Sequence, residues 1–145
     1  MCLIIDANVA THTFSSPPHS DFEPIRNALF QGQAYMVHGG RLTEEYSRIG
    51  KVVAALAVLD RAGRAKVIRS ATLSVTEEKL RASGQCASND FHIIALAQLS
   101  GARLLCSHDQ LLHHDFTNKN LLSNPRGSIY QTPTHAHLIR RHCNK

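Results

Sequence analysis

Short apolar runs alternate along the chain with longer stretches in which apolar residues recur at the spacing of a helix face. The runs lie at residues 2–5, 34–37, 65–68, 102–106 and 128–131. The first and fourth hardly alternate between apolar and polar positions, which is typical of strands buried on both faces of a parallel sheet. The pattern predicts an α/β fold: a three-layer α/β/α sandwich with a central, mainly parallel sheet and the last strand at its edge.

Helical spacing of apolar residues marks the segments between these strands. The predicted helices lie at residues 21–30, 41–62, 76–83 and 89–100, with one helical turn at 110–114. A glycine follows each of the four longer helices, as expected where a helix ends. Thr76 and Ser88 are the expected N-caps of the third and fourth helices. Val53 and Leu99 are among the apolar residues expected to face the core, and residues 11–24 are predicted to form a loop.

The composition fits one compact domain followed by a short tail. The chain has 145 residues, 43% of them hydrophobic, which is enough for a sizeable core. We assign residues 1–131 to the domain and expect residues 132–145 to be a basic, His-rich tail that is flexible or weakly helical. No apolar run is long enough to span a membrane and no signal-peptide pattern is present, so we expect a cytoplasmic protein without a membrane partner.

Cysteine spacing and net charge narrow the classes of function. Cys2, Cys86, Cys106 and Cys143 are scattered without a C-x-x-C pair, which favours free thiols over disulfides or a zinc site. The formal net charge of +5 favours a polyanionic partner.

Four acidic residues occupy positions that a parallel sheet brings toward one edge. Asp6 follows the first strand, Glu45 lies early in the helix after the second strand, and Asp109 follows the strand at 102–106. Carboxyl ends of parallel strands and amino ends of the following helices share one edge, where such sheets bind ligands. Asp90 joins them if the amino end of its helix tilts over that edge.

Each acid also has a structural interpretation. Asp6 directly after a strand can cap the following turn, and acids in the first turn of a helix interact favourably with its dipole. Glu44 and Glu45 are adjacent, and the sequence does not decide between them. If the acids do gather, their mutual repulsion requires a cation, and Mg²⁺ or Mn²⁺ is the hard ion that carboxylates prefer.

The chain resembles the PIN-domain family of metal-dependent ribonucleases. The matching segments are IIDANV at the start, LTEEY around Glu45, and SNDFHIIALAQLSGARLLCSHD, which contains Asp90 and ends at Asp109. The resemblance covers Cys2 to about Phe116. It implies that Asp6, Glu45, Asp90 and Asp109 are catalytic metal ligands, directly or through water. It also implies that Asn8 and Ser107 support them and that Asp115 occupies the place of a further acid found in some members.

The same resemblance implies an activity and partners. It implies hydrolysis of RNA phosphodiester bonds with Mg²⁺ or Mn²⁺, which would activate a water molecule and clamp the scissile phosphate. Many family members are toxins of toxin–antitoxin pairs, so a cognate antitoxin and a homodimer are further expectations. Basic residues near the acids would bind RNA, which is a polyanion. The candidates are Arg41, Arg48, Lys51 and Arg126, with Arg140 and Arg141 of the tail.

Three other functions have partial support in the sequence. A haloacid-dehalogenase-type phosphatase also begins with a strand followed by Asp, but it requires a second Asp where this chain has Asn8. A receiver-type phosphoacceptor domain requires an acidic pair and a lysine that are missing here. A non-catalytic module of the same fold, binding nucleic acid or protein, differs from the nuclease only in whether the acids meet.

Overall fold

The computed structural model describes residues 1–143 and shows an α/β fold around a five-stranded sheet. The strands are β1 (Leu3–Ile5), β2 (Met36–Gly39), β3 (Ala65–Ile68), β4 (Leu104–Cys106) and β5 (Ser128–Tyr130). All pairings are parallel, in the order β3-β2-β1-β4-β5. The predicted α/β class and parallel sheet are confirmed, and the last strand lies at an edge as expected.

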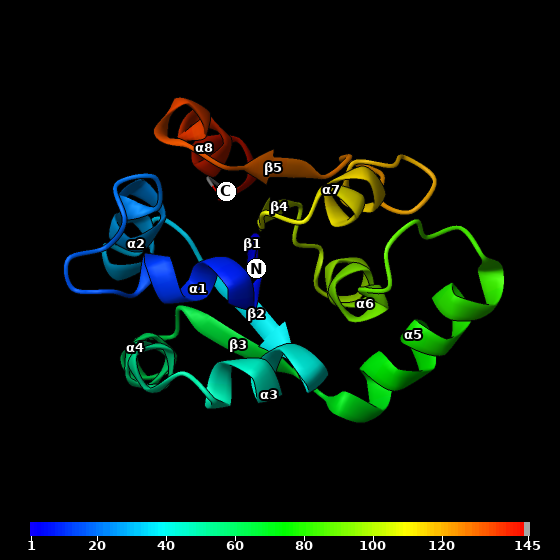
Figure 1. Cartoon of the computed structure of the whole chain (residues 1–145), viewed down its shortest axis with the longest axis horizontal. Helices are drawn as coiled ribbons and strands as arrows, with labels where there is room; N and C mark the ends of the chain where they lie inside the picture. The colour runs from blue at the N-terminus through cyan, green and yellow to red at the C-terminus, as the bar shows by residue number, and fades with distance from the viewer. Residues whose placement is uncertain (144–145) are drawn as a thin grey trace.

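Helices cover both faces of this sheet. They are α1 (Ala7–Thr13), α2 (Glu23–Phe30), α3 (Gly40–Ser47), α4 (Gly50–Arg61), α5 (Ser70–Ser83), α6 (Phe91–Ser100), α7 (Gln110–Phe116) and α8 (His137–Cys143), with a 3-10 helix, η1, at Pro133–His135. Figure 1 shows α1, α2 and α4 on one side of the sheet and α5, α6 and α7 on the other. The result is the predicted three-layer α/β/α sandwich.

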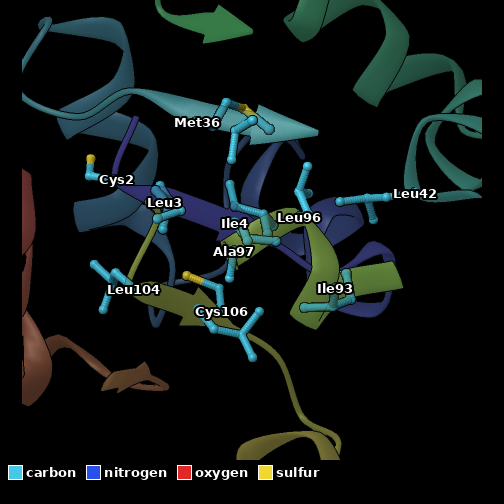
Figure 2. Packing of buried hydrophobic residues seen from close by; sticks show 14 of the residues in the cluster. Cys2, Leu3, Ile4, Met36, Leu42, Ile93, Leu96, Ala97, Leu104 and Cys106 are labelled. Carbon is cyan, nitrogen blue, oxygen red and sulfur yellow. The ribbon is translucent and has the colours of Figure 1, made fainter. Parts of the chain in front are cut away.

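The core centres on β1 and α6. β1 pairs with β4 in the register Leu3↔Leu104, and all three of its residues are fully buried. In Figure 2, Ile93 and Leu96 of α6 lie among side chains from β1, β2 and β4. The segment from His92 to Ala97 is buried all round, so α6 lacks a polar face there. The expectation for Leu99 is wrong, because its side chain is 40% exposed near the helix end.

The segment predicted as one long helix is two helices. Helix α3 ends at Ser47, and Ile49 is extended (φ −120°, ψ 101°) before α4 begins at Gly50. Apolar spacing continues across this break, so periodicity alone did not reveal it. Val53, expected to face the core, is 46% exposed because the break changes the direction of the second helix.

Helix starts differ from the predicted ones in three other places. Helix α5 begins at Ser70, six residues before the expected cap Thr76. The N-cap of α6 is Asp90 rather than Ser88. Helix α1 runs from Ala7 to Thr13 and therefore includes the first residues of the loop predicted at 11–24. The predicted helix ends were more accurate: Gly101 ends α6 in the left-handed conformation, with φ +82°.

Residues 133–143 of the C-terminal segment form η1 and α8, which fits the helical alternative for the tail rather than the flexible one. Leu138 and Ile139 of α8 are buried, and α8 packs against β4. Cys143 forms a disulfide with Cys2, across 141 residues of sequence. The preference for free thiols is therefore wrong at these two positions, because the tail brings its cysteine to the start of β1. Disulfides persist in oxidising compartments, so this bond does not fit the expected cytoplasmic location.

The chain reverses its direction across the sheet at β1. From β1 it moves outward to β2 and β3, then crosses to β4 and β5 on the other side. The carboxyl ends of β1 and β4 therefore flank a topological switch point, where open α/β sheets form their ligand crevice. Within the described residues, no helix is long and apolar enough to cross a membrane.

Candidate functional site

Asp6 lies at the switch point, held from the neighbouring strand. It follows β1 directly, and its backbone N–H extends the ladder by bonding to the Cys106 carbonyl at 2.9 Å. Its carboxylate accepts a 2.8 Å hydrogen bond from the Ser107 hydroxyl, which is buried at the end of β4. Burial raises the pKa of Asp6, the bond from Ser107 lowers it, and the nearby Asp109 charge raises it. Asp6 makes no side-chain capping hydrogen bond to α1, and the backbone N–H of Ala7 also lowers its pKa.

Asp109 combines the two roles that the sequence suggested. It is the N-cap of α7, and its carboxylate accepts hydrogen bonds from the N–H groups of Leu111 (3.0 Å) and Leu112 (3.3 Å). Its own N–H donates to the Ser107 hydroxyl at 3.1 Å. The structural interpretation is thus correct for Asp109, whose carboxylate nevertheless faces the other acids.

Asp90 reaches the same edge from the amino end of α6. Its carboxyl group lies close to that of Asp109, and its pKa is raised to about 6. Burial is the main cause, followed by the interaction with the Asp109 side chain and the charges of Asp6 and Asp109, with the charge of Arg41 acting in the opposite direction. We call Asp6, Asp90 and Asp109 the acidic cluster. Its members come from three separate segments of the chain, and their charges act on one another at this edge of the sheet.

Glu45 lies beside the acidic cluster on α3. The hydroxyl of its neighbour Tyr46 is buried and donates to the carbonyl of Ile5, which fixes α3 to the end of β1. Burial and then the charge of Asp6 raise the pKa of Glu45, whereas Arg41 and Arg48 lower it. Glu44 is exposed and points elsewhere on the helix. The geometry therefore selects Glu45 from the adjacent pair.

His92 is a member of this region that the sequence reasoning missed. Its ring is 5% exposed, and Nε2 lies 3.5 Å from Oε1 of Glu45 without a hydrogen-bond partner. Burial, followed by the charge of Arg41, lowers its pKa to about 4, so the ring is neutral at neutral pH. The available signal was a histidine two positions after Asp90 in an otherwise apolar helix.

Two residues expected to support the site differ in their placement. Asn8 is exposed on α1 and has no hydrogen bond to the acidic cluster. Asp115 is fully buried in α7 and holds the chain before Asp90. Its carboxylate accepts the N–H groups of Ala87 (2.7 Å) and Ser88 (2.9 Å) and the Ser88 hydroxyl (2.8 Å). Asp115 thus positions the segment that carries Asp90.

The basic candidates divide between opposite edges of the sheet. Arg41 and Arg48 lie on or just after α3, close enough to affect the pKa of Glu45. Lys51 is further along, where its Nζ donates to the Ser15 hydroxyl at 2.9 Å. Arg126 precedes β5 and therefore lies at the amino ends of the strands, on the edge opposite the acidic cluster. Arg140 and Arg141 lie on α8, whose last residue is bonded to Cys2 at that same opposite edge.

The donor set suits a hard divalent cation, although the described residues contain no ready-made group of three His, Cys, Asp or Glu side chains for a metal ion. Carboxylate oxygens are the ligands that Mg²⁺ prefers, and this ion retains several waters rather than requiring an all-protein cage. Burial, and then the neighbouring acids, raise the pKa of Asp90, and a bound cation would offset both effects. The unpartnered Nε2 of His92 is a second sign of an unsatisfied site.

Neither a protein-family model nor a curated protein sequence matches this chain.

Proposed function

We propose that this protein is a Mg²⁺- or Mn²⁺-dependent ribonuclease similar to PIN-domain nucleases. The main support is the position of Asp90 beside Asp109 and Asp6, where burial and then these two acids raise its pKa to about 6. These acids are distant in sequence and gain no stability from their mutual repulsion. A role in holding a cation explains why they gather at the switch point.

Each acidic residue has a separate part in this proposal. Asp6, Asp90 and Asp109 hold the divalent ion, and Glu45 contributes from the side, directly or through water. The Ser107 hydroxyl holds the Asp6 carboxylate and accepts the backbone N–H of Asp109. The carboxylate of Asp109 is held separately, by the N–H groups of Leu111 and Leu112. When bound, the ion would polarise the phosphodiester and lower the pKa of a water ligand.

Basic residues beside the cluster would bind the substrate. Arg41 and Arg48 are exposed, and their charges act on Glu45. Guanidinium groups match phosphate oxygens in a bidentate arrangement, so these two arginines suit RNA phosphates flanking the cleaved bond. His92 would orient Glu45, because a small movement closes the 3.5 Å gap between Nε2 and Oε1 into a hydrogen bond.

The test is cleavage of single-stranded and structured RNA with and without millimolar Mg²⁺ or Mn²⁺. We expect metal-dependent products from the wild type and a loss of at least about a hundredfold in Asp6→Asn and Asp90→Asn. Asp60→Asn is the matched control, because Asp60 is exposed on α4 and should retain full activity. RNA retention without cleavage would replace the nuclease by a binding module. Hydrolysis of phosphomonoesters alone would indicate a phosphatase.

Metal binding has its own measurement, which does not depend on finding the right RNA. We expect saturating Mg²⁺ or Mn²⁺ to raise the wild-type melting temperature by about 3 °C or more, because the ion binds only the folded state. The Asp6→Asn/Asp109→Asn double variant should lose this rise. No shift in the wild type with either ion would contradict the proposed site.

A further inference from the structure

A basic hollow of about 380 Å³ lies at the amino ends of the strands, opposite the acidic cluster. Its lining residues are Pro125, Arg126, Gly127, Ser128, Arg141 and His142. They come from the segment entering β5 and from the last turns of α8, which meet where His142 contacts the Ser128 hydroxyl. This hollow is outside the proposed catalytic site and contains two of the basic candidates that the site does not use.

The wall entering β5 is held in place by several contacts. Nε of Arg103 donates to the Pro125 carbonyl at 3.0 Å, and the Ser128 N–H donates to the Arg103 carbonyl at 2.8 Å. Gly127 passes so close to α7 that an added Cβ would lie 2.1 Å from the Phe116 carbonyl oxygen. Only glycine fits there. Arg126 is therefore carried by a fixed segment of backbone.

The opposite wall is α8, which is held by its buried side and by a disulfide. Leu138 and Ile139 are buried, and Cys143 is joined to Cys2 at the start of β1. The buried His142 ring crosses between the two walls, with Nε2 2.9 Å from the Ser128 hydroxyl. The hollow is thus a preorganised feature, which lowers the entropic cost of binding a ligand.

The charge of the hollow has a single sign. Arg126 and Arg141 are exposed, and within residues 1–143 neither makes an ion pair or a hydrogen bond. No acidic residue is among the lining residues. Ser128 adds a hydroxyl group, which can donate a hydrogen bond to a ligand while its oxygen is paired with Nε2 of His142. Two free guanidinium groups and a hydroxyl around one hollow match the oxygens of a phosphate group.

We propose that this basic hollow binds a phosphate group through Arg126, Arg141 and Ser128. The group comes from a free nucleotide or from the backbone of an RNA chain. With the cluster of carboxylates at the other edge, the hollow gives the protein two charged sites of opposite sign. The proposal does not depend on cleavage, because phosphate binding here requires none of the acidic residues.

The test measures binding in EDTA, so that the acidic cluster holds no divalent ion. Inorganic phosphate, adenosine 5′-monophosphate and a short single-stranded RNA are titrated separately by calorimetry, with the His142 ring resonances followed by NMR. We expect saturable binding of at least one probe and a shift of the His142 signals. Binding of phosphate or the nucleotide but not RNA identifies a free phosphate ligand, whereas tighter RNA binding identifies a backbone phosphate.

Two pairs of variants separate a site from general positive charge. The Arg126→Gln/Arg141→Gln variant should weaken binding at least about tenfold, since each lost phosphate contact removes a counterion-release contribution. The Arg61→Gln/Arg69→Gln control removes the same charge from exposed residues outside the lining and should change binding less than about twofold. Unchanged melting curves verify folding of all variants.

Specific outcomes would overturn this proposal. The hollow is not a phosphate site if no probe saturates, if both double variants weaken binding equally, or if the His142 signals stay fixed while a probe binds. These titrations are made in EDTA and measure no cleavage. Failure of the phosphate site is therefore distinguishable from failure of the proposed nuclease.

Discussion

The Ser107 hydroxyl donates a 2.8 Å hydrogen bond to the carboxylate of Asp6, 101 residues earlier in the chain. The same hydroxyl accepts the N–H of Asp109, so one buried side chain fixes two members of the acidic cluster. The ends of β1 and β4 are therefore joined by a side chain in addition to the backbone ladder.

Replacing Ser107 by alanine should impair the site more than the fold. Ser107→Ala removes one hydrogen bond from a carboxylate and one from an N–H group, which should lower the free energy of unfolding by about 1–2 kcal/mol. Cleavage should fall by about 10–100-fold, as is typical when a ligand loses its supporting bond. Urea unfolding and RNA cleavage test this, with exposed Ser20→Ala as the control. Unchanged cleavage would show that Asp6 needs no support.

The raised pKa of Asp90 predicts how stability depends on pH in the metal-free protein. Its folded pKa is about 6, against an ordinary value of 3.8, so between these values the folded state binds more protons than the unfolded state. The contribution of Asp90 to stability is therefore full below about pH 4 and is lost as the pH rises through about 6. His92 acts in the opposite direction, because its lowered pKa makes stability decline as the pH falls from 6.5 toward about 4.

Comparing a variant with the wild type isolates Asp90 from His92. As the pH rises from 4 to 6.5, the free energy of unfolding of Asp90→Asn should increase by about 1–2 kcal/mol relative to that of the wild type. This figure allows for solvent screening of a half-buried group. Urea unfolding in EDTA at several pH values measures this difference. A difference that is constant with pH would mean that Asp90 titrates normally.

Asp115 should be important for stability regardless of metal. Asp115→Ala leaves three donors on Ala87 and Ser88 without an acceptor, two of them buried, so we expect the free energy of unfolding to fall by about 2–4 kcal/mol. Asp60→Ala, at an exposed site, should change stability by less than about 0.5 kcal/mol. Equal unfolding curves for the two variants would contradict the positioning role. The Asp115→Ala variant should also lose cleavage, because Asp115 holds the segment that directly precedes Asp90.

The disulfide between Cys2 and Cys143 should contribute strongly to stability. It closes a loop spanning 141 positions, and constraining so long a loop in the unfolded chain is worth about 3–5 kcal/mol. Cys143→Ser should show this loss of unfolding free energy in urea unfolding. A reducing agent should lower the unfolding free energy of the wild type to the same level. Cys86→Ser is the control, because that thiol is free. A wild type insensitive to reduction would contradict this expectation.

The sheet and part of the site could be predicted because their signals are local. Asp6 and Asp109 each follow a short apolar run, and parallel topology brings such positions together whatever the intervening sequence. Asp90 needed one further condition, the tilt of α6, which depends on packing that no window of sequence contains.

The features that were missed depend on contacts between distant segments. The break before Ile49 interrupts a helix without interrupting apolar spacing, so the pattern does not show it. Asp115 has a structural role because three donors from another segment reach it. His92 acquires its position only once α3 places Glu45 beside it. Pairing of Cys2 with Cys143 likewise requires that the tail return to β1.

The bond between Cys2 and Cys143 makes almost the whole described chain one covalent ring. A protease that cuts the exposed segment at residues 123–126 would therefore release no fragment. The nicked molecule would migrate as one species on a non-reducing gel and as two pieces after reduction, and the longer piece would carry all three residues of the acidic cluster.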